Sequence, residues 1–482
     1  VEIRGGQRVW SGRVNRFTQQ GAAEPPSLPE ARRVRARAYH RRVPRTLASE
    51  PDPPAASRVP GTAPVHDPTE FLTNTSEIRP RAALGVPGAV PEGWGCPPVA
   101  SVGSAAWSAG EVAAMADPFA PVRGTLAVPG TAGVVACFAY ELGRILEPAS
   151  RGAEPPADPR MFPAVVTHRC VAVARSAAWE APGLAFRVGR FRSQSGGPGF
   201  RRAVARAVDY IHAGDCFQVN LAHRLSAEFE GSVRGLAGVL LERIAPSMGA
   251  YIEVPDVHGT VRSAILSLSP ELFLRYDAAT RRVVTRPIKG TRAVGAGVDA
   301  LERSAKDAAE LAMIVDLMRN DLGRTCRPGS IRVERPRDIE SFGLDPSAAV
   351  RHTVATVSGE LAAGKTVFDL VAGAFPPGSV TGAPKIRAMQ IIEELETCAR
   401  GPYCGAIGWF GADGSATLSV PIRTAVVHLE PGSTPDRASG VIDLHVGAGI
   451  VAESDPMAEW FETLHKAGTI LSVLGQEAEA IE

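Results

Sequence analysis

The sequence is almost without lysine. It holds 52 basic residues against 51 acidic ones, yet only five of the basic residues are lysine, and none occurs before position 289. An ammonium group can release its proton and act as a nucleophile, whereas a guanidinium group practically cannot. Each lysine is therefore a candidate for a position that arginine cannot fill, although some are expected to be surface charges. The five are Lys289, Lys306, Lys365, Lys385 and Lys466.

Other absences disfavour whole classes of function. The formal net charge is only +1, whereas nucleic-acid-binding proteins typically carry an excess of basic residues. We therefore expect no nucleic-acid partner. No apolar run reaches the roughly 18 residues of a membrane span, and no secretory signal opens the sequence. We therefore expect no membrane association and a cytoplasmic location. The seven cysteines form no C-x-x-C pair, which favours reduced thiols and argues against a zinc site.

Composition divides the chain into three regions. Residues 1–67 are rich in Arg and Pro and are expected to be mostly disordered, with a nucleic-acid arm or an organelle transit peptide as the alternatives. Residues 68–195 look globular, with a buried strand at 133–140 and a Gly/Ser stretch at 193–199 that reads as a linker. Residues 196–482 carry the strongest patterns and are expected to form the catalytic domain.

Hydrophobic spacing from residue 200 onward predicts helices and strands in irregular alternation. A strand is expected at 219–225, where apolar and polar residues alternate, and another at 282–285. This order favours an α+β fold over a doubly wound sheet. The expected helices lie at 200–214, 301–318 and 383–396 and from Ser454-Asp455-Pro456 onward.

The first candidate site is the segment Arg286–Thr291, where Lys289 lies between a proline turn and a glycine, just after a strand. Glycine lets a ligand approach the backbone, and a lysine in a partly dry cleft can lose its proton and attack carbon. Glu271 follows a strand and a proline and is a candidate general acid if desolvation raises its pKa. The alternative for both residues is an ordinary exposed turn.

Two predicted helices carry acidic residues that suit a metal ion. Glu310 follows Lys306 by four positions, and Glu459, Glu462 and Lys466 share one face of the last helix. Carboxylates that meet from two helices would form an all-oxygen site, which suits Mg²⁺. The alternative in each helix is a solvent-exposed set of surface salt bridges.

Glycine-rich turns supply candidate anion-binding groups. The turn at 376–385 leads into a helix N-terminus but matches neither a Walker loop nor a dinucleotide fingerprint. We therefore expect the substrate anion to be a carboxylate, which Arg423 could bind in bidentate fashion and Tyr403 could contact through its hydroxyl. His352 lies in a Val-rich stretch and, taken alone, is predicted to be a core histidine.

Taken in order over about residues 200–475, these motifs resemble those of the chorismate-utilising enzymes. That family includes anthranilate synthase component I, aminodeoxychorismate synthase component I, and the isochorismate and salicylate synthases. The resemblance implies an α+β fold: a large chorismate-binding domain of two stacked, mostly antiparallel β-sheets with helices packed outside. It also implies chorismate as substrate and Mg²⁺ as cofactor.

The same resemblance implies roles for single residues. Lys289 and Glu271 are implied as nucleophile and general acid, and His352 occupies the family's active-site histidine position. Glu310 and Glu462 are the implied Mg²⁺ ligands, with Glu459 beside them. The implied substrate-binding groups are Gly290, Thr291, Tyr403, Arg423, Gly447, Ala448, Gly449, Lys466 and Gln218.

Two positions separate the branches of the family. The isochorismate and salicylate enzymes carry a water-activating lysine where this chain has Gln218, so ammonia rather than water is the expected nucleophile. Anthranilate synthases usually read P-I-A-G-T where this chain reads P-I-K-G-T, and the lysine variant is similar to the aminodeoxychorismate synthases. Ammonia would then come from a separate glutamine amidotransferase subunit. Anthranilate synthesis is the alternative.

Overall fold

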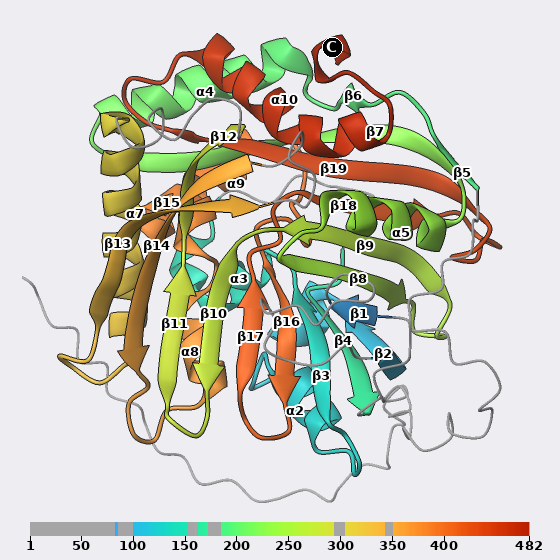
Figure 1. Ribbon diagram of the computed structural model, residues 1–482, viewed down its shortest axis with the longest axis horizontal. Coiled ribbons are helices and arrows are strands. Elements are labelled where there is room, and N and C mark those ends of the chain that lie inside the picture. The colour runs from blue at the N-terminus through green and yellow to red at the C-terminus, as the bar shows by residue number, and fades with distance from the viewer. Residues whose placement is uncertain are drawn as a thin grey trace, which may run out of the picture. The chain divides into compact units, whose positions relative to one another are not determined.

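The computed structural model describes residues 82–84, 100–152, 160, 162–171, 185–293, 304–342 and 350–481. Residues 1–67, which are expected to be disordered, lie outside this set, and so does Cys96. The described residues all fall in one compact unit, Pro68–Glu482. Their strands form two sheets, and every pairing between named strands is antiparallel (Figure 1).

The first sheet lies across the upper half of Figure 1 and has nine strands within the described ranges. Its order is β1-β8-β9-β18-β19-β7-β15, and β5 and β6 also pair with β7. The strands are β1 (Ala82–Leu84), β5 (Phe186–Val188), β6 (Arg192–Ser193), β7 (Gln218–Gly231), β8 (Met248–Pro255), β9 (Val261–Ser269), β15 (Gly382–Ala383), β18 (Thr424–Leu429) and β19 (Ala438–Ile450).

The second sheet has ten described strands, which run nearly vertically in Figure 1. Its order is β12-β14-β11-β10-β17-β16-β3-β4-β2, and β13 pairs with β14. Strands from residues 100–171 therefore share one sheet with strands from the predicted catalytic domain. The strands are β2 (Ala100–Trp107), β3 (Gly133–Phe138), β4 (Val165–Val171), β10 (Leu272–Asp277), β11 (Arg282–Arg286), β12 (Ile288–Ala293), β13 (Arg332–Phe342), β14 (Val350–Glu360), β16 (Ala406–Gly411) and β17 (Ala416–Ser419).

The start of one helix can be explained by its capping residue, and that of another by the apolar face that it buries. The last helix starts at Pro456, after Asp455 accepts hydrogen bonds from the N–H groups of Met457 and Ala458. One prediction is wrong: residues 193–199 are not a linker, because a helix begins at Gly196 and buries a stripe that starts at Phe200. The helices are α1 (Ala109–Ala113), α2 (Ala120–Leu126), α3 (Leu142–Leu146), α4 (Gly196–His212), α5 (Val233–Ile244), α7 (Ala305–Gly323), α8 (Val367–Ala374), α9 (Lys385–Leu395) and α10 (Pro456–Val473).

Strand β3 is buried on both faces and shows how the layers stack. Val135 and Cys137 belong to a core cluster with Ile252 and Ile265, which lie on β8 and β9 of the other sheet. On the opposite face, the ring of Phe138 contacts the ring of Phe119, at the start of α2, with centroids 5.6 Å apart. The second sheet thus lies between the first sheet and helices, and the predicted α+β fold is confirmed.

The first sheet is covered by helices on its outer side. In Figure 1, α4 and α10 lie side by side above β7 and β19. Trp460 of α10 and Phe200 of α4 contribute to this layer, with ring centroids 6.0 Å apart. Helix α10 therefore lies directly above the strand that carries the predicted glycine-rich motif Gly447–Gly449.

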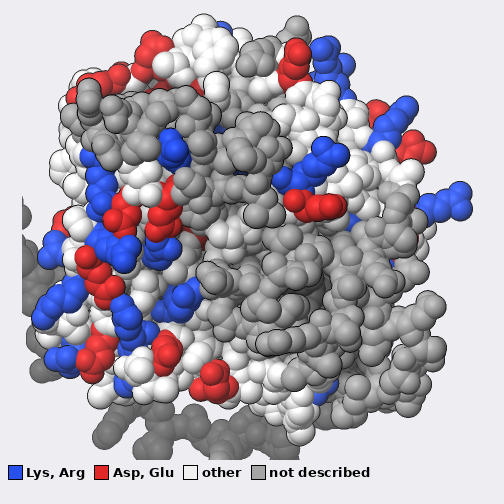
Figure 2. All heavy atoms as spheres, viewed as in Figure 1, with Lys and Arg blue, Asp and Glu red and all other residues white. Residues whose placement is uncertain are grey.

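Charges on the face shown in Figure 2 are of both signs. They gather at the left of the view, over β11, β13 and β14, where basic and acidic side chains pair. Arg282 binds Glu334 at 2.6 Å and Arg335 binds Asp338 at 3.0 Å. Among the described residues, no helix is both long enough and apolar enough to span a membrane.

Candidate active site

Lys289 and Glu310 meet at the boundary between β12 and α7. The Nζ atom of Lys289 lies 2.8 Å from Oε2 of Glu310, and both side chains are largely buried. Gly290 has a φ of +83°, which favours glycine, and a Cβ atom there would lie 3.0 Å from Cγ of Asp307 on α7. Glycine therefore lets β12 approach the helix closely enough for the ion pair to form.

The glycines of β19 form a bare stretch of backbone facing this lysine. A Cβ atom on Gly449 would lie 2.8 Å from Nζ of Lys289 and 3.0 Å from Nε2 of Gln218. A Cβ atom on Gly447 would lie 3.0 Å from both the hydroxyl of Tyr403 and Oδ1 of Asn220. Because alternate residues of a strand share a face, polar groups from three other segments converge over one side of β19.

Two amide oxygens at this place are buried without a partner. Oε1 of Gln218 and Oδ1 of Asn220 make no hydrogen bond within the described part of the chain. Buried polar atoms are nearly always hydrogen-bonded, so two orphans on one strand suggest a site that a polar ligand completes. Both residues lie on β7, two positions apart and therefore on the same face.

Glu271 is a buried carboxyl group at the start of β10. Burial raises its pKa to about 7, against the opposing effects of a hydrogen bond from Ser379, the N–H of Ile288 and the charge of Lys289. The Ser379 hydroxyl donates to Oε1 at 2.6 Å. The desolvation that a general acid requires is therefore present, and the group can hold a proton near neutral pH.

His352 and Arg423 form the basic side of the site. His352 lies on β14 opposite Thr291 of β12, and burial together with the charge of Arg423 lowers its pKa to about 3. His352 is therefore a neutral imidazole at physiological pH. Burial also lowers the pKa of Arg423, whose guanidinium makes no hydrogen bond or ion pair with any other described residue. An unpaired, desolvated guanidinium is suited to a carboxylate ligand.

Helix α10, which packs against β19, carries the remaining acidic candidates, Glu459 and Glu462. Lys466 donates to the carbonyl of Gly447 at 2.8 Å and pairs with Oε1 of Glu462 at 2.8 Å, with both side chains about half exposed. Glu459 is buried and accepts a hydrogen bond from Ser454 at 2.7 Å, so it is not part of a solvated face. The alternative of a uniformly exposed charged face is therefore wrong for Glu459.

These residues fit the oxygen chemistry of Mg²⁺. Glu310 binds Lys289, which faces Gly449, and Glu462 binds Lys466, which donates to the carbonyl of Gly447. Across the described ranges, no three His, Cys, Asp or Glu side chains gather closely enough to form a metal site by themselves. Two carboxylates, completed by water and substrate oxygens, are the usual Mg²⁺ arrangement, so the residues present fit this ion.

Most residues singled out in the sequence are thus brought together. Of Thr291 only the backbone is described, opposite His352, and Ala448 pairs with Leu221 between the two glycines. Lys385 lies apart: it binds Asp321 at 2.7 Å and the carbonyl of Ala374 and closes the end of α7 onto α9.

Two further residues, Asn220 and Ser379, lie here although no role was predicted for them from sequence. Asn220 could have been found, because it lies two positions after Gln218 on a predicted strand and so shares its face. Ser379 lies 108 positions from its partner Glu271, and no local pattern links the two.

Comparison with known proteins identifies the family and the fold. The model of the chorismate binding enzyme family matches residues 125–472, more than half of the chain. The chain belongs to this family. Solved structures show the same fold: anthranilate synthase component I from Streptococcus pneumoniae TIGR4 matches with a TM-score of 0.63 and 23% identity, covering 85% of this chain and 95% of that one. A menaquinone-specific isochorismate synthase from Escherichia coli gives a TM-score of 0.59 at 18% identity, covering 85% and 92%.

Two curated relatives are equally similar in sequence. The chain is 41% identical over 299 residues to anthranilate synthase component 1 of Thermus thermophilus, covering 60% of this chain and 59% of that protein. It is also 41% identical over 272 residues to aminodeoxychorismate synthase component 1 of Klebsiella aerogenes, covering 55% of each. The matched stretches span less than two thirds of these relatives, and identity alone does not choose between them.

Proposed function

We propose that this chain is an aminodeoxychorismate synthase component I, which converts chorismate and ammonia to 4-amino-4-deoxychorismate. The observation that carries the proposal is the place of Lys289. Its amine lies against the bare backbone of Gly449, beside Gln218 and 2.8 Å from Oε2 of Glu310. A lysine here can form a covalent bond with substrate, and anthranilate synthases usually have alanine in this motif.

The proposed first step is a displacement across the ring. The Lys289 amine bonds to C2 of chorismate, the ring double bond shifts, and the C4–O bond breaks as Glu271 donates its proton, so that water leaves. The neutral carboxyl that this step needs is available because burial raises the pKa of Glu271 to about 7. Covalent catalysis divides one difficult substitution into two easier ones.

In the second step ammonia bonds to C4, the double bond shifts back, and the C2–N bond to Lys289 breaks. One proton of the added ammonia returns to the protein, so both Lys289 and Glu271 are restored. The unpaired oxygens of Gln218 and Asn220 and the guanidinium of Arg423 supply acceptors and a donor for the polar groups of the substrate. His352, neutral and buried, completes the wall of the site.

Bound Mg²⁺ would neutralise and orient a substrate carboxylate. Glu310 and Glu462 are the residues that would hold it, with Glu459 beside them. We further propose that the ammonia comes from a separate glutamine amidotransferase subunit. That partner is an expectation from the family relationship rather than from any described surface.

Product analysis tests the proposal. The full chain is incubated with chorismate, Mg²⁺ and an ammonium salt, and products are separated with and without an aminodeoxychorismate lyase. We expect 4-amino-4-deoxychorismate alone, converted to 4-aminobenzoate only when the lyase is added. Direct formation of anthranilate without lyase would refute the assignment and support the second candidate, anthranilate synthase component I. That candidate is favoured by the equal identity of the Thermus thermophilus relative.

A further inference from the structure

Arg400 is among the largest fully buried side chains and does not touch the proposed reacting groups. It lies after α9 and forms a two-pronged ion pair with Glu396. Nε donates to Oε2 at 2.9 Å and Nη2 donates to Oε1 at 2.6 Å. A buried pair of this kind is stable only when its remaining hydrogen-bonding atoms are also satisfied.

The other N–H groups of Arg400 reach two separate backbone segments. Nη2 also donates to the carbonyl of Asn220 on β7 at 2.8 Å, and Nη1 donates to the carbonyl of Val380 at 3.1 Å. The neighbour of Val380 in the chain is Ser379, which donates to the proposed general acid. Glu396 extends the same network, because its Oε1 accepts from the N–H of Ala222 on β7 at 2.8 Å.

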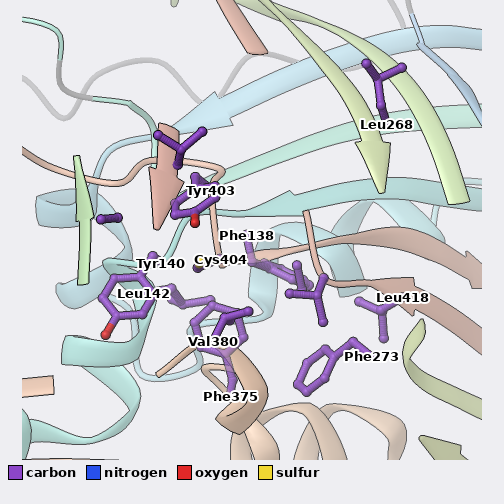
Figure 3. Packing of buried hydrophobic residues seen from close by; sticks show 14 of the residues in the cluster. Phe138, Tyr140, Leu142, Leu268, Phe273, Phe375, Val380, Tyr403, Cys404 and Leu418 are labelled. Atoms are coloured by element: carbon purple, nitrogen blue, oxygen red, sulfur yellow. The ribbon is translucent and has the colours of Figure 1, made fainter. Parts of the chain in front are cut away.

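The loop that carries Arg400 also carries Tyr403, and hydrogen bonds to Glu141 hold its first residues in place. Oε1 of Glu141 accepts from the N–H of Arg400 at 2.8 Å and from that of Gly401 at 3.3 Å, and the N–H of Tyr403 bonds the Arg400 carbonyl. The guanidinium lies over the ring of Tyr140, 4.5 Å from its centroid. Figure 3 shows Tyr140, Tyr403 and Val380 gathered in this part of the core.

We propose that Arg400 is a positioning residue for the reaction: one guanidinium fixes β7, the Ser379 loop and the Tyr403 loop relative to one another. Each segment delivers a group to the site: the Asn220 side chain, the hydrogen bond to Glu271, and the Tyr403 hydroxyl beside Gly447. The inference rests on the proposed function only in taking chorismate as the substrate measured.

Lysine cannot replace this arginine. The planar fork of arginine reaches two carboxylate oxygens and two carbonyls with four bonds at once, whereas an ammonium is a point charge with three donors on a flexible stem. Arg400→Lys keeps the charge but leaves at least one of these four acceptor oxygens without its hydrogen bond. The variant separates positioning from simple charge balance.

The experiment compares Arg400→Lys with Arg234→Lys. Arg234 is a matched control, because it also binds carboxylates, Glu253 at 2.7 Å and Asp436 at 2.9 Å, at a place where no proposed site residue lies. Chorismate consumption is measured by mass spectrometry at saturating and limiting substrate, well below each variant's thermal midpoint. We expect kcat/KM of Arg400→Lys to fall at least about tenfold, a loss of roughly 1.4 kcal/mol, and that of Arg234→Lys to stay within about twofold.

A double-mutant cycle with Tyr403→Phe tests whether Arg400 acts through the site. If it does, the loss caused by Arg400→Lys is smaller in the Tyr403→Phe background, because coupled residues are not additive. Fully additive losses, or equal losses in the two lysine variants, overturn the proposal. Should Arg400→Lys not fold, Glu396→Gln takes its place in the same cycle.

Wild-type turnover keeps the two hypotheses apart. A wild-type protein that consumes no chorismate contradicts the proposed function. A wild type that consumes chorismate, whichever amino product it forms, beside an unimpaired Arg400→Lys variant contradicts only the positioning role.

Discussion

The side chains of Lys289 and Glu310 are in direct contact, with Nζ of the lysine 2.8 Å from Oε2 of the glutamate. The residue proposed to attack the substrate therefore binds the residue proposed to hold the metal ion. A carboxylate oxygen bound to an ammonium is a poorer ligand for a second cation, so the two roles of Glu310 compete. Replacing either partner is expected to affect more than its own step.

We expect Glu310→Gln to lose nearly all activity and not to recover it at high Mg²⁺ concentration. The amide keeps the shape of the side chain but lacks the charge that a divalent cation needs. Asp316→Asn on the same helix is the control, because Asp316 is exposed and binds only Arg319 among the described residues. Calorimetric titration with Mg²⁺ and chorismate measures binding apart from turnover, and unaltered Mg²⁺ affinity in Glu310→Gln would contradict the assignment.

Lys289→Ala and Lys289→Arg should both lose aminodeoxychorismate formation by several orders of magnitude. Alanine removes the nucleophile, and arginine keeps a positive charge but cannot act as a neutral amine. Lys365→Ala, which removes an exposed lysine 3.8 Å from Asp369, should keep full activity. The measurement is product formation by liquid chromatography. Undiminished product from Lys289→Ala without added amine would rule out the covalent role.

The pH dependence of kcat/KM should report Glu271, because that parameter reflects the ionisation of the free enzyme. As a general acid it must carry its proton, and its pKa is about 7, so the rate should fall as pH rises above that value. Glu271→Gln cannot donate a proton and should be slower by about 10²–10⁴-fold. Ser379→Ala removes a hydrogen bond that favours the charged form, so the falling limb should move to higher pH. A limb that stays in place or moves to lower pH in Ser379→Ala would show that another group titrates.

Gly449→Ala should abolish turnover while leaving the fold intact. The new methyl group would lie 2.8 Å from Nζ of Lys289 and 3.0 Å from Nε2 of Gln218, both of which belong to side chains that must then move. Gly468→Ala on α10 is the control, because nothing lies within 4 Å of its added Cβ atom. That helical substitution should raise stability by about 0.5–1 kcal/mol, which thermal unfolding measures. An active Gly449→Ala enzyme would mean that this backbone does not contact substrate.

Lys385→Ala should destabilise the protein by about 3 kcal/mol or more. It leaves the buried carboxylate of Asp321 without its charged partner, which is costly. Lys365→Ala breaks only an exposed pair and should cost less than about 1 kcal/mol. Chemical denaturation at neutral pH measures both. Equal losses in the two variants would show that burial of the Lys385–Asp321 pair contributes nothing extra.

Local patterns in the sequence were sufficient for most helices and for the order of the motifs. The cap at Asp455 and the stripe after Phe200 are short-range features, so their helices could be predicted. The start of α4 at Gly196 could not, because glycine and serine alone suggest a loop and packing under Trp460 overrides them. Residue type and neighbours indicated candidate roles for Lys289, Glu271 and Arg423, whereas the full set of site roles came from resemblance to a family.

What local patterns cannot supply is the partner of a side chain. The spacing of Glu310 on its helix shows only its local neighbours, whereas the structure pairs it with Lys289 of β12, a partner that no spacing predicts. The helical spacing of Glu459 left a solvent-exposed charged face open as the alternative to a metal site, yet the residue is buried. Ser379 and Glu271 meet only because a loop after α8 folds onto the start of β10. Such contacts depend on tertiary packing, which places residues more than a hundred positions apart side by side.

The glycines of β19 have a consequence for how this enzyme could change. Gly447 and Gly449 cannot be replaced without disturbing the site. Any added side chain would collide with Lys289, Gln218, Asn220 or Tyr403. We expect changes of product in this chain to arise from side chains beside or opposite this backbone, such as those at positions 218 on β7 and 289 on β12. Combinatorial libraries aimed at new products should accordingly keep β19 constant and vary β7 and β12.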